Sequence, residues 1–419
     1  MVSLHYAGDI GDNEEVHPFR VAVRDGVSEE VASKIAGTPS MELTENPALA
    51  QATLIRSATK FTQADVFKQW PELMYVARVG VGVDNIDMNI ASEAGIATIN
   101  TPGASTEAVA TRALTFMLAW SARVKQGTEA LKEKKWPKGG KETEPQDLSE
   151  ATLGVIGYGR IGQALARQSE QFFGKIVYSD AQAVEGAIPL SELLAQSDVI
   201  SVHASGQNEV LTRELLRMVK PGALIVNTSR GGVINPDGLL ECMNERNVSA
   251  ALDVFHVEGA AMFDDERIQL ITQHERFFGT PHTAASDAVT QRKLGMEGAG
   301  YVTQFAQAGT VNAAKLPGHT LARMEPSEMS NPGVRAVITH PSVKGTVAKI
   351  SGIAAQSGHN ISQFCNEQGP EFGGKRLAIT AFDLEEKTAK DGLIVLRQIS
   401  AEIDVLRSRL LLFTNGDIE

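Results

Sequence analysis

Apolar and polar residues alternate along the first hundred positions in short blocks, and the block lengths predict strands that alternate with helices. Apolar runs at Arg20–Val23, Ala52–Ile55 and Met74–Ala77 have the length of buried strands. Helical spacing follows at Val31–Ile35 and Ala64–Trp70. Strands that alternate with helices favour a parallel sheet, so this region predicts a small α/β domain.

The middle of the chain repeats this alternation more regularly. A long amphipathic helix is expected over Thr106–Val124, and a basic, irregular loop is expected over 132–141. Six strand-like runs then follow, with helical patterns such as Arg160–Phe172 and Pro236–Asn244 between them. They are Thr152–Ile156, Ile176–Ser179, Val199–His203, Ala223–Asn227, Ala250–Val254 and Phe277–Gly279. The pattern predicts a doubly wound, Rossmann-type parallel sheet.

The last part of the chain changes pattern. Residues 286–307 are helical again, and residues 309–332 have the composition of a linker. Residues 333–419 then give the order strand, helix, strand, strand, helix, strand, which is typical of a ferredoxin-like α+β domain. Because this segment carries no acid–base set, we expect it to regulate or assemble the protein, and its deletion to leave a folded enzyme.

A glycine-rich turn joins the first strand of the Rossmann-type region to its first helix. Gly157, Gly159 and Gly162 give G-x-G-x-x-G, and Arg160 and Ile161 open the helix. Glycine permits the tight turn and the close approach of a pyrophosphate to the helix N-terminus. Asp180, which closes the next strand, can accept hydrogen bonds from a ribose diol and repel a 2′-phosphate. The sequence therefore predicts NAD rather than NADP; the alternative is a glycine-rich turn without a ligand.

Composition narrows the class of protein further. A chain of 419 residues predicts two or three domains, and its net charge of −12 disfavours nucleic acid and anionic membranes as partners. No apolar run approaches the ~20 residues of a spanning helix, and the first residues do not resemble a secretory signal. Cys242 and Cys365 form neither a disulfide framework nor a metal spacing. We expect a cytoplasmic protein without a metal site.

Three further segments place polar residues after apolar runs. Arg230, Glu258 and His282 each follow a predicted strand, where open α/β sheets bind ligands. An arginine can hold a carboxylate, and a histidine can take a hydroxyl proton as a hydride leaves. A glutamate bonded to that histidine would fix its tautomer. Taken singly, each residue is as easily a surface charge or a capping group; together they predict oxidation of a 2-hydroxy acid.

Over about residues 50–300, the chain resembles the D-isomer-specific 2-hydroxyacid dehydrogenases. Six motifs carry the resemblance: Arg56–Lys60, Arg78–Asn85, Gly154–Gly162, Asn227–Gly232, Ala251–Glu258 and Pro281-His282. The terminal segment resembles an ACT domain, a module that binds amino acids.

The resemblance implies a reaction and a domain plan. The reaction is the NAD-dependent oxidation of 3-phospho-D-glycerate to 3-phosphooxypyruvate, the first step of L-serine synthesis, by a homo-oligomer. The alternatives are another D-2-hydroxyacid dehydrogenase, such as a hydroxypyruvate or glyoxylate reductase, or a non-catalytic NAD-sensing scaffold. The implied domains are a flavodoxin-like substrate domain at 15–103 completed by 285–325, a Rossmann domain at 104–284, and an ACT-like domain at 333–419.

The resemblance also implies roles for single residues. Arg230, Glu258 and His282 match the catalytic set. The cofactor-binding positions are Gly157, Gly159, Arg160, Ile161, Gly162, Asp180, His203, Thr228 and Asp253. The substrate-binding positions are Arg56, Ser57, Lys60, Arg78, Val81 and Gly82, of which Arg56, Lys60 and Arg78 suit a phosphate. Trp136 and Lys138 resemble an element near subunit contacts, and His340, Ser342 and Asn360 are candidate effector contacts.

Several positions depart from the family pattern. Gly259 replaces the proline that usually follows the glutamate, and the segment from His203 to Gly206 replaces the usual His-Val-Pro. In the terminal segment, Ser342 stands where an asparagine is usual and Lys344 where a proline is usual. The contact to the adenine side and the response to serine therefore stay open.

Overall fold

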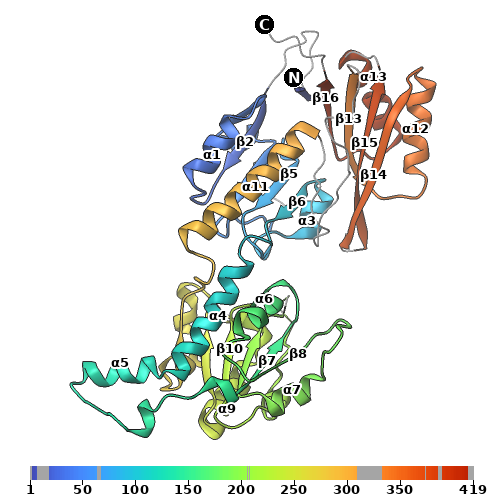
Figure 1. Cartoon of the computed structure of the whole chain (residues 1–419). Coiled ribbons are helices and arrows are strands. Elements are labelled where there is room, and N and C mark those ends of the chain that lie inside the picture. The colour runs from blue at the N-terminus through green and yellow to red at the C-terminus, as the bar shows by residue number, and fades with distance from the viewer. Residues whose placement is uncertain are drawn as a thin grey trace. The chain divides into compact units, whose positions relative to one another are not determined.

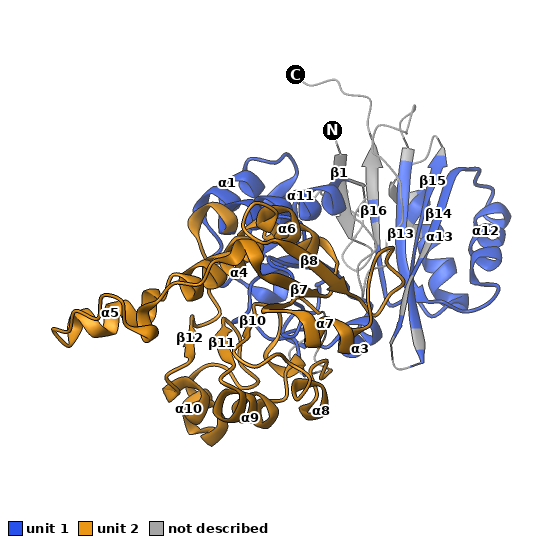
Figure 2. Cartoon of the chain, turned by 60° about the horizontal axis from the view of Figure 1, so that its bottom comes forward, with its two compact units in different colours: residues 1–104, 291–419 blue, residues 105–290 orange. Residues whose placement is uncertain are grey.

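The computed structural model describes residues 2–6, 18–63, 68–204, 206, 208–308, 333–372, 374–385 and 389–413. Its contacts divide the chain into two compact units. Unit 1 joins Met1–Ala104 with Gln291–Glu419, and unit 2 is the continuous segment Ser105–Thr290 (Figure 2). The predicted helix at Ala64–Trp70 and the predicted linker at 309–332 fall wholly or largely outside the described residues.

Unit 2 is built on a six-stranded parallel sheet in the order β12-β11-β10-β9-β7-β8 (Figure 1). Alternate residues of its strands feed two cores. Ile156, Ile200 and Ile225 belong to one core, and Val155, Val199 and Leu224 belong to the other. A sheet buried on both faces needs apolar side chains at successive positions, which explains the unbroken apolar runs. The strands are β7 (Thr152–Ile156), β8 (Lys175–Ser179), β9 (Val199–Val202), β10 (Leu224–Asn227), β11 (Ser249–Leu252) and β12 (Phe277–Gly279).

Helices cover both faces of this sheet, so the predicted doubly wound fold is confirmed. They are α4 (Thr106–Ser121), α5 (Val124–Lys132), α6 (Arg160–Ser169), α7 (Leu190–Gln196), α8 (Arg213–Leu216), α9 (Pro236–Arg246) and α10 (Glu266–Gln273). The helix predicted over Thr106–Val124 is confirmed over Thr106–Ser121 but ends earlier than predicted. Arg123 adopts a left-handed conformation with φ of 54°, so α4 ends at Ser121 and the separate helix α5 begins at Val124.

The first part of unit 1 is a five-stranded parallel sheet in the order β3-β2-β4-β5-β6, which is the flavodoxin-like order. The strands are β2 (Phe19–Val23), β3 (Met41–Leu43), β4 (Ala52–Ile55), β5 (Tyr75–Arg78) and β6 (Ala97–Asn100), and the helices are α1 (Glu29–Ala36), α3 (Met88–Glu93) and α11 (Ala288–Ala308). The strands β3 and β6 and the helix α3 were not predicted from the sequence. Phe305 of α11 stacks on Tyr75 of β5 with ring centroids 4.3 Å apart, which ties α11 to this sheet.

The second part of unit 1 is an antiparallel sheet in the order β1-β16-β13-β15-β14. Its elements are β1 (Val2–Tyr6), β13 (Gly333–Pro341), α12 (Thr346–Gln356), β14 (Ile361–Phe372), β15 (Lys375–Glu385), α13 (Ala389–Glu402) and β16 (Arg407–Phe413). The predicted ferredoxin-like order of residues 333–413 is confirmed. The N-terminal strand β1 pairs with β16 at the edge of this sheet, which the sequence did not indicate.

The two faces of the antiparallel sheet have different neighbours. Val334, Ala336 and Ile338 share a core with buried residues of α12 and α13. The opposite face contributes Val337, Ile379 and Ala381 to the core that also holds Phe19 and Phe305. Arg335 and Asp383 form a fully buried bidentate ion pair on that face, at 2.7 and 2.8 Å. A segment with this much shared core is not a detachable module, so its deletion should disrupt unit 1 rather than leave it intact.

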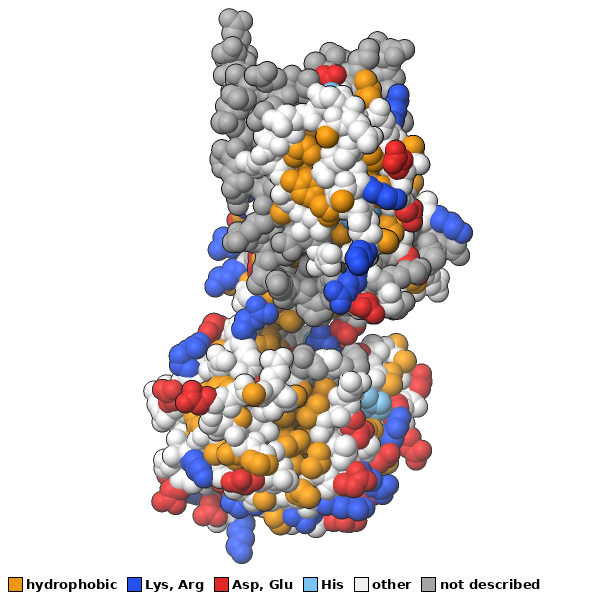
Figure 3. Space-filling model, turned by 90° about the vertical axis from the view of Figure 1, so that its right-hand side faces the viewer, with side chains coloured by type: hydrophobic (Ala, Val, Ile, Leu, Met, Phe, Trp, Pro, Cys, Tyr) orange, Lys and Arg blue, Asp and Glu red, His pale blue; other side chains and the backbone are white. Residues whose placement is uncertain are grey.

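Some hydrophobic side chains stay on the surface of this terminal part. Figure 3 looks onto the side of the molecule that carries α12 and shows hydrophobic side chains gathered there. Val343 and Val347, at the start of α12, are among the exposed large hydrophobic residues. Among the described residues, no helix has both the length and the apolar character needed to cross a membrane.

Candidate active site

The turn from β7 into α6 forms the first part of the candidate site. Gly157 has φ of +86°, and a Cβ there would overlap the backbone of His203. A Cβ on Gly162 would overlap the carbonyl group of Gly157, so α6 packs this close only with glycine. A Cβ on Gly159, by contrast, would point into open space, and Arg160 beside it is exposed. The open side of the turn leaves room for an anionic group at the first amides of α6.

Asp180 follows β8 and lies directly beside this turn. Its carboxylate accepts hydrogen bonds from the backbone N–H of Tyr158, at 2.6 Å, and of Gln182, at 2.8 Å. The rings of Tyr158 and Tyr178 stack next to it, with centroids 3.7 Å apart. These hydrogen bonds hold the Asp180 carboxylate, the predicted ribose contact, against the glycine-rich turn.

Two buried polar atoms at neighbouring strand ends lack hydrogen-bond partners in the part of the chain that the structure describes. They are Nδ1 of His203, after β9, and Oγ1 of Thr228, after β10. The Nε2 atom of His203 lies 2.9 Å from Ser201 Oγ. Burial lowers the pKa of His203 to about 4, so its ring is neutral at pH 7. Buried polar atoms are rarely left unpaired, so these two fit the polar groups of a ligand such as NAD.

Arg230 is carried by a tight turn after β10. The side chain of Asn227 shapes the turn, because its Nδ2 donates to the carbonyl group of Arg230 at 2.8 Å and its Oδ1 accepts from the N–H of Ser229 at 3.0 Å. Gly231 lies so close to the next loop that a Cβ there would overlap the backbone of Phe255. The turn that carries Arg230 therefore packs on the loop that carries Glu258.

Glu258 and His282 form a hydrogen-bonded pair. Nδ1 of His282 lies 2.8 Å from Oε2 of Glu258, and the backbone N–H of Phe255 donates to Oε1 of Glu258 at 3.3 Å. Because a carboxylate only accepts, the proton of the neutral imidazole lies on Nδ1. The Nε2 atom is then left with a lone pair, and about half of the His282 side chain is exposed. This is the tautomer that a general base needs.

The pair shifts the titration of both partners. The pKa of His282 is raised, first by the hydrogen bond with Glu258; burial opposes this, and the charges of Glu258 and Asp253 add to it more than Arg230 subtracts. Burial raises the pKa of the Glu258 carboxyl, but the hydrogen bond and charge of His282, with smaller contributions from Phe255 and Arg230, leave it lowered overall. The imidazolium form of His282 is thus stabilised next to an ionised carboxylate.

Asp253 holds the loop that presents His282. Its buried carboxylate accepts from Thr280 Oγ1, from the N–H of Thr283 at 2.9 Å and from the N–H of Ala284 at 3.0 Å. The Asp253 carbonyl accepts from the N–H of His282 at 2.7 Å, which holds His282 in a left-handed conformation with φ of 52°. The structure thus places the Asp253 carboxylate, for which a cofactor-binding role is predicted, against the loop that carries His282.

The predicted substrate-binding residues all lie in unit 1. Arg56, Ser57 and Lys60 belong to the loop after β4, and among the described residues neither Arg56 nor Lys60 takes part in an ion pair. Arg78 ends β5 and donates to the carbonyl group of Val79 at 3.1 Å.

The loop that carries Val81 and Gly82 follows Arg78. Thr101 Oγ1 accepts from the N–H of Gly80 at 2.7 Å, and Asn100 Nδ2 donates to the Val81 carbonyl group. Gly80 has φ of +140°, and a Cβ there would overlap the guanidinium group of Arg78. Glycine is thus needed for Arg78 to fold over this loop.

Of the candidate effector residues, His340 lies in β13, Ser342 directly follows this strand and Asn360 directly precedes β14. His340 is buried, with Nε2 at 2.9 Å from Thr380 Oγ1 and Nδ1 at 2.9 Å from the carbonyl group of Pro341. Burial lowers the pKa of His340, and the bond to Pro341 opposes this only in part. Ser342 donates its backbone N–H to the carbonyl group of Arg376 at 2.8 Å, and Asn360 is exposed. The histidine thus already uses both ring nitrogens.

The residues that shape these loops had no predicted role. Asn227, Thr280, Asp25 and Asn85 hold the loops through hydrogen bonds. Of these, Asp25 had a usable signal: Asp-Gly after a strand predicts a turn in a left-handed conformation. The others bond across elements distant in sequence, or within a turn that no local pattern reveals.

Comparisons with known proteins show the family to which the chain is related. Residues 114–284 match the family model of the D-isomer specific 2-hydroxyacid dehydrogenase, NAD binding domain. A hydroxypyruvate reductase from Thermotoga maritima is 37% identical over 67% of this chain and 95% of its own length. A D-3-phosphoglycerate dehydrogenase from Methanocaldococcus jannaschii is 32% identical over 75% of this chain, but only 61% of its own length is covered. The solved structure of the TT0316 protein from Thermus thermophilus matches with a TM-score of 0.59 and 26% identity, over 68% of this chain and 96% of that one.

The fold and the family model together define an NAD-dependent oxidoreductase. The chain belongs to the D-isomer specific 2-hydroxyacid dehydrogenases, so it is an enzyme of small 2-hydroxy acids that uses NAD. The relatives are split between hydroxypyruvate reductase and D-3-phosphoglycerate dehydrogenase.

Proposed function

We propose that this enzyme oxidises 3-phospho-D-glycerate to 3-phosphooxypyruvate, the first step of L-serine synthesis. The observation that carries the proposal is the loop after β4, where Arg56 and Lys60 form no ion pair with any described residue. Two cations without internal counter-charges suit a phosphate dianion, which an unphosphorylated 2-hydroxy acid does not offer. The D-3-phosphoglycerate dehydrogenase matches point the same way.

In this proposal each residue of the candidate catalytic set has one task. Arg230 holds the substrate carboxylate and polarises the carbonyl group that forms at C2. The Nε2 atom of His282 takes the hydroxyl proton, and Glu258 stabilises the resulting imidazolium. NAD bound at this site would supply the acceptor for the hydride that leaves C2. The proposed NAD contacts are the Gly157–Gly162 turn with Arg160 and Ile161, and Asp180, His203, Thr228 and Asp253. The Asp253 carboxylate also supports the His282 loop.

The second candidate function is reduction of hydroxypyruvate or a related 2-oxo acid. It is favoured by the Thermotoga maritima hydroxypyruvate reductase, which matches over almost its whole length. The non-catalytic scaffold is disfavoured, because the chain belongs to a family of enzymes and because a scaffold has no need of the Glu258–His282 pair.

Steady-state kinetics with a panel of 2-hydroxy and 2-oxo acids tests the choice. We expect the highest kcat/KM for 3-phospho-D-glycerate and its oxo product. Arg56→Ala and Lys60→Ala should each raise KM for the phosphorylated substrates far more than for hydroxypyruvate. Equal effects on both classes of substrate, or a wild-type preference for hydroxypyruvate, would favour the reductase instead.

The domain plan is part of the same proposal. We assign substrate binding to residues 15–103 with 285–325, NAD binding to 104–284, and an ACT-like regulatory or assembly role to 333–419. One proposed surface for self-association is the segment after α5 that carries Trp136, a residue 79% exposed. The other is the surface of α12 together with the exposed Val343, which precedes this helix. Exposed aromatic and apolar side chains are typical of interfaces. Analytical ultracentrifugation of Trp136→Ser and Val343→Ser variants would show which surface, if either, is used.

A further inference from the structure

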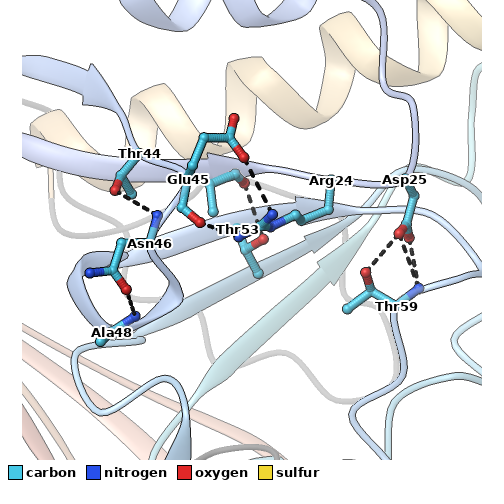
Figure 4. A network of polar contacts seen from close by, with 9 residues as sticks. Arg24, Asp25, Thr44, Glu45, Asn46, Ala48, Thr53 and Thr59 are labelled. Carbon is cyan, nitrogen blue, oxygen red and sulfur yellow. Dashed lines mark hydrogen bonds and ion pairs between the residues drawn. The ribbon is translucent and has the colours of Figure 1, made fainter.

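The loop after β4 is held from one side by the carboxylate of Asp25. This carboxylate accepts from the backbone N–H of Arg56 at 2.7 Å. It also accepts from the backbone N–H of Thr59 at 3.0 Å and from Thr59 Oγ1 at 2.7 Å (Figure 4). Asp25 itself has φ of 61°, a left-handed conformation that aspartate, asparagine and glycine adopt with the least strain. The turn after β2 therefore places a charged acceptor against the backbone of the loop after β4.

Asn85 holds the same loop through its carbonyl groups. Its Nδ2 donates to the carbonyl group of Arg56 at 2.8 Å and to that of Thr59 at 2.7 Å. The Asn85 side chain is largely buried. The backbone of Asn85 also contacts the end of this loop, where the N–H of Phe61 donates to the Asn85 carbonyl group at 2.8 Å. Both the donor and the acceptor groups of Arg56 and Thr59 are thus used by side chains from two other loops.

The carboxylate of Asp25 does not neutralise the cations of the loop it holds. Its partners are backbone N–H groups and the Thr59 hydroxyl, while the Arg56 guanidinium and the Lys60 ammonium form no ion pair with a described residue. Ser57 and Lys60 lie on the surface side of the loop, and both side chains are exposed. The loop backbone is therefore held by hydrogen bonds, while the cationic groups of Arg56 and Lys60 are available to bind an anionic ligand.

We propose that Asp25 and Asn85 are positioning residues that fix the Arg56–Lys60 loop as a preorganised phosphate-binding element. The inference rests on the proposed function, because it takes the phosphate of the substrate as the ligand of Arg56 and Lys60. A loop that is ordered before binding does not lose conformational freedom when the anion binds, so its affinity is higher. Freeing the loop should therefore weaken phosphorylated substrates selectively.

Asp25 and Asn85 together form a clamp on the Arg56–Lys60 loop. Asp25→Gly and Asn85→Ala each remove one of its two side chains. Asp25→Gly keeps a residue that tolerates the left-handed backbone while it removes the carboxylate. Asp25→Gly should raise KM for 3-phospho-D-glycerate roughly tenfold to a hundredfold, the range expected when hydrogen bonds to a charged group are lost. Asn85→Ala removes hydrogen bonds between neutral groups and should raise this KM less, by roughly three- to tenfold. KM for hydroxypyruvate and kcat for either substrate should change no more than about threefold, since the catalytic groups are left in place.

Matched variants separate this role from general stability. Thr59→Val removes the hydroxyl that bonds Asp25 and should act in the same direction, whereas Thr59→Ser keeps it and should restore wild-type KM. Glu45→Gln is the neighbouring control, because it breaks the ion pair with Arg24 from the same turn but leaves the Arg56–Lys60 loop alone. If Asp25→Gly raises both KM values equally, or only lowers the melting temperature, the positioning role is overturned.

Limited trypsin digestion gives a readout that does not depend on substrate. Trypsin cuts after Arg56 and Lys60, and an ordered loop resists it. Asp25→Gly should be cut there faster than wild type, while Glu45→Gln should not. If the wild type shows no preference for phosphorylated substrates, the proposed function fails, and the clamp is judged on digestion alone: equal cutting in wild type and Asp25→Gly would overturn it.

Discussion

Two histidines in this molecule have opposite surroundings although the sequence marks both as functional candidates. His282, in unit 2, pairs with the carboxylate of Glu258, is half-exposed and has a raised pKa. His340, in unit 1, bonds only neutral groups, the Thr380 hydroxyl and the Pro341 carbonyl, and burial lowers its pKa.

The difference shows which histidine can do chemistry. A histidine that acts as a base needs a free lone pair, access to solvent or substrate, and a partner that stabilises the imidazolium it becomes. His282 has all three, and it is held in a left-handed conformation by the Asp253 carbonyl group. His340 has its ring nitrogens engaged and its charge disfavoured, which is the condition of a structural residue. Only their environments separate the two.

The largest expected effect tests this contrast directly. His282→Ala should lower kcat by about 10²–10⁴-fold, because general acid–base catalysis is lost, while NAD affinity stays close to wild type. His340→Gln is the matched control and should leave kcat within about threefold, as an uninvolved residue does. Stopped-flow kinetics and NAD titration measure both. A His282→Ala enzyme with more than a third of wild-type kcat would contradict the assignment.

Glu258→Gln should move the pH profile. Oxidation needs neutral His282, so its rate rises as pH rises through the raised pKa of the wild type. Without the carboxylate the pKa of His282 falls, so this rising limb should shift to lower pH. Reduction needs protonated His282, and its falling limb should shift to lower pH as well. The measurement is kcat/KM against pH in both directions; limbs that do not move would mean that Glu258 does not tune His282.

His340→Gln should affect stability rather than rate. The loss of buried hydrogen bonds should cost about 1–3 kcal/mol at neutral pH. Because the folded pKa of His340 is lowered, its contribution is complete above its ordinary pKa and is lost as pH falls from there through the folded pKa. The difference in melting temperature between wild type and variant should therefore shrink on acidification from neutral pH. A difference in melting temperature that grows on acidification would contradict a lowered pKa of His340 in the folded state.

The smallest expected effect is the response to L-serine. His340 has no ring nitrogen to spare, and Ser342 reaches less far than the asparagine usual at that position. We expect weak inhibition or none when the full-length enzyme is titrated with L-serine at millimolar concentration. Inhibition at micromolar serine that His340→Ala abolishes would show that the buried histidine opens to an effector.

Much of the fold could be predicted because it depends on local patterns. The six strands of the Rossmann-type sheet and the ferredoxin-like order of the terminal part follow from apolar runs and helical spacing. The break at Arg123 could not, since no glycine or proline marks it and the left-handed residue is an arginine. The Glu258–His282 pair was predictable only as two strand-end residues that share one sheet edge. The roles of Asp25, Asn85 and Asp253 depend on contacts between distant segments, so they needed coordinates.

The shared core of unit 1 has a consequence for the order in which the chain folds. Unit 2 is continuous, so it can fold as soon as residues 105–290 have left the ribosome. Unit 1 cannot finish then, because Phe19 and Tyr75 share their core with Val337 and Ala381, which are synthesised near the end. The apolar surface of its first hundred residues therefore stays partly exposed until residues 333–385 are synthesised. Contacts between residues so far apart in sequence form slowly. The part of the enzyme that is made first is therefore completed last.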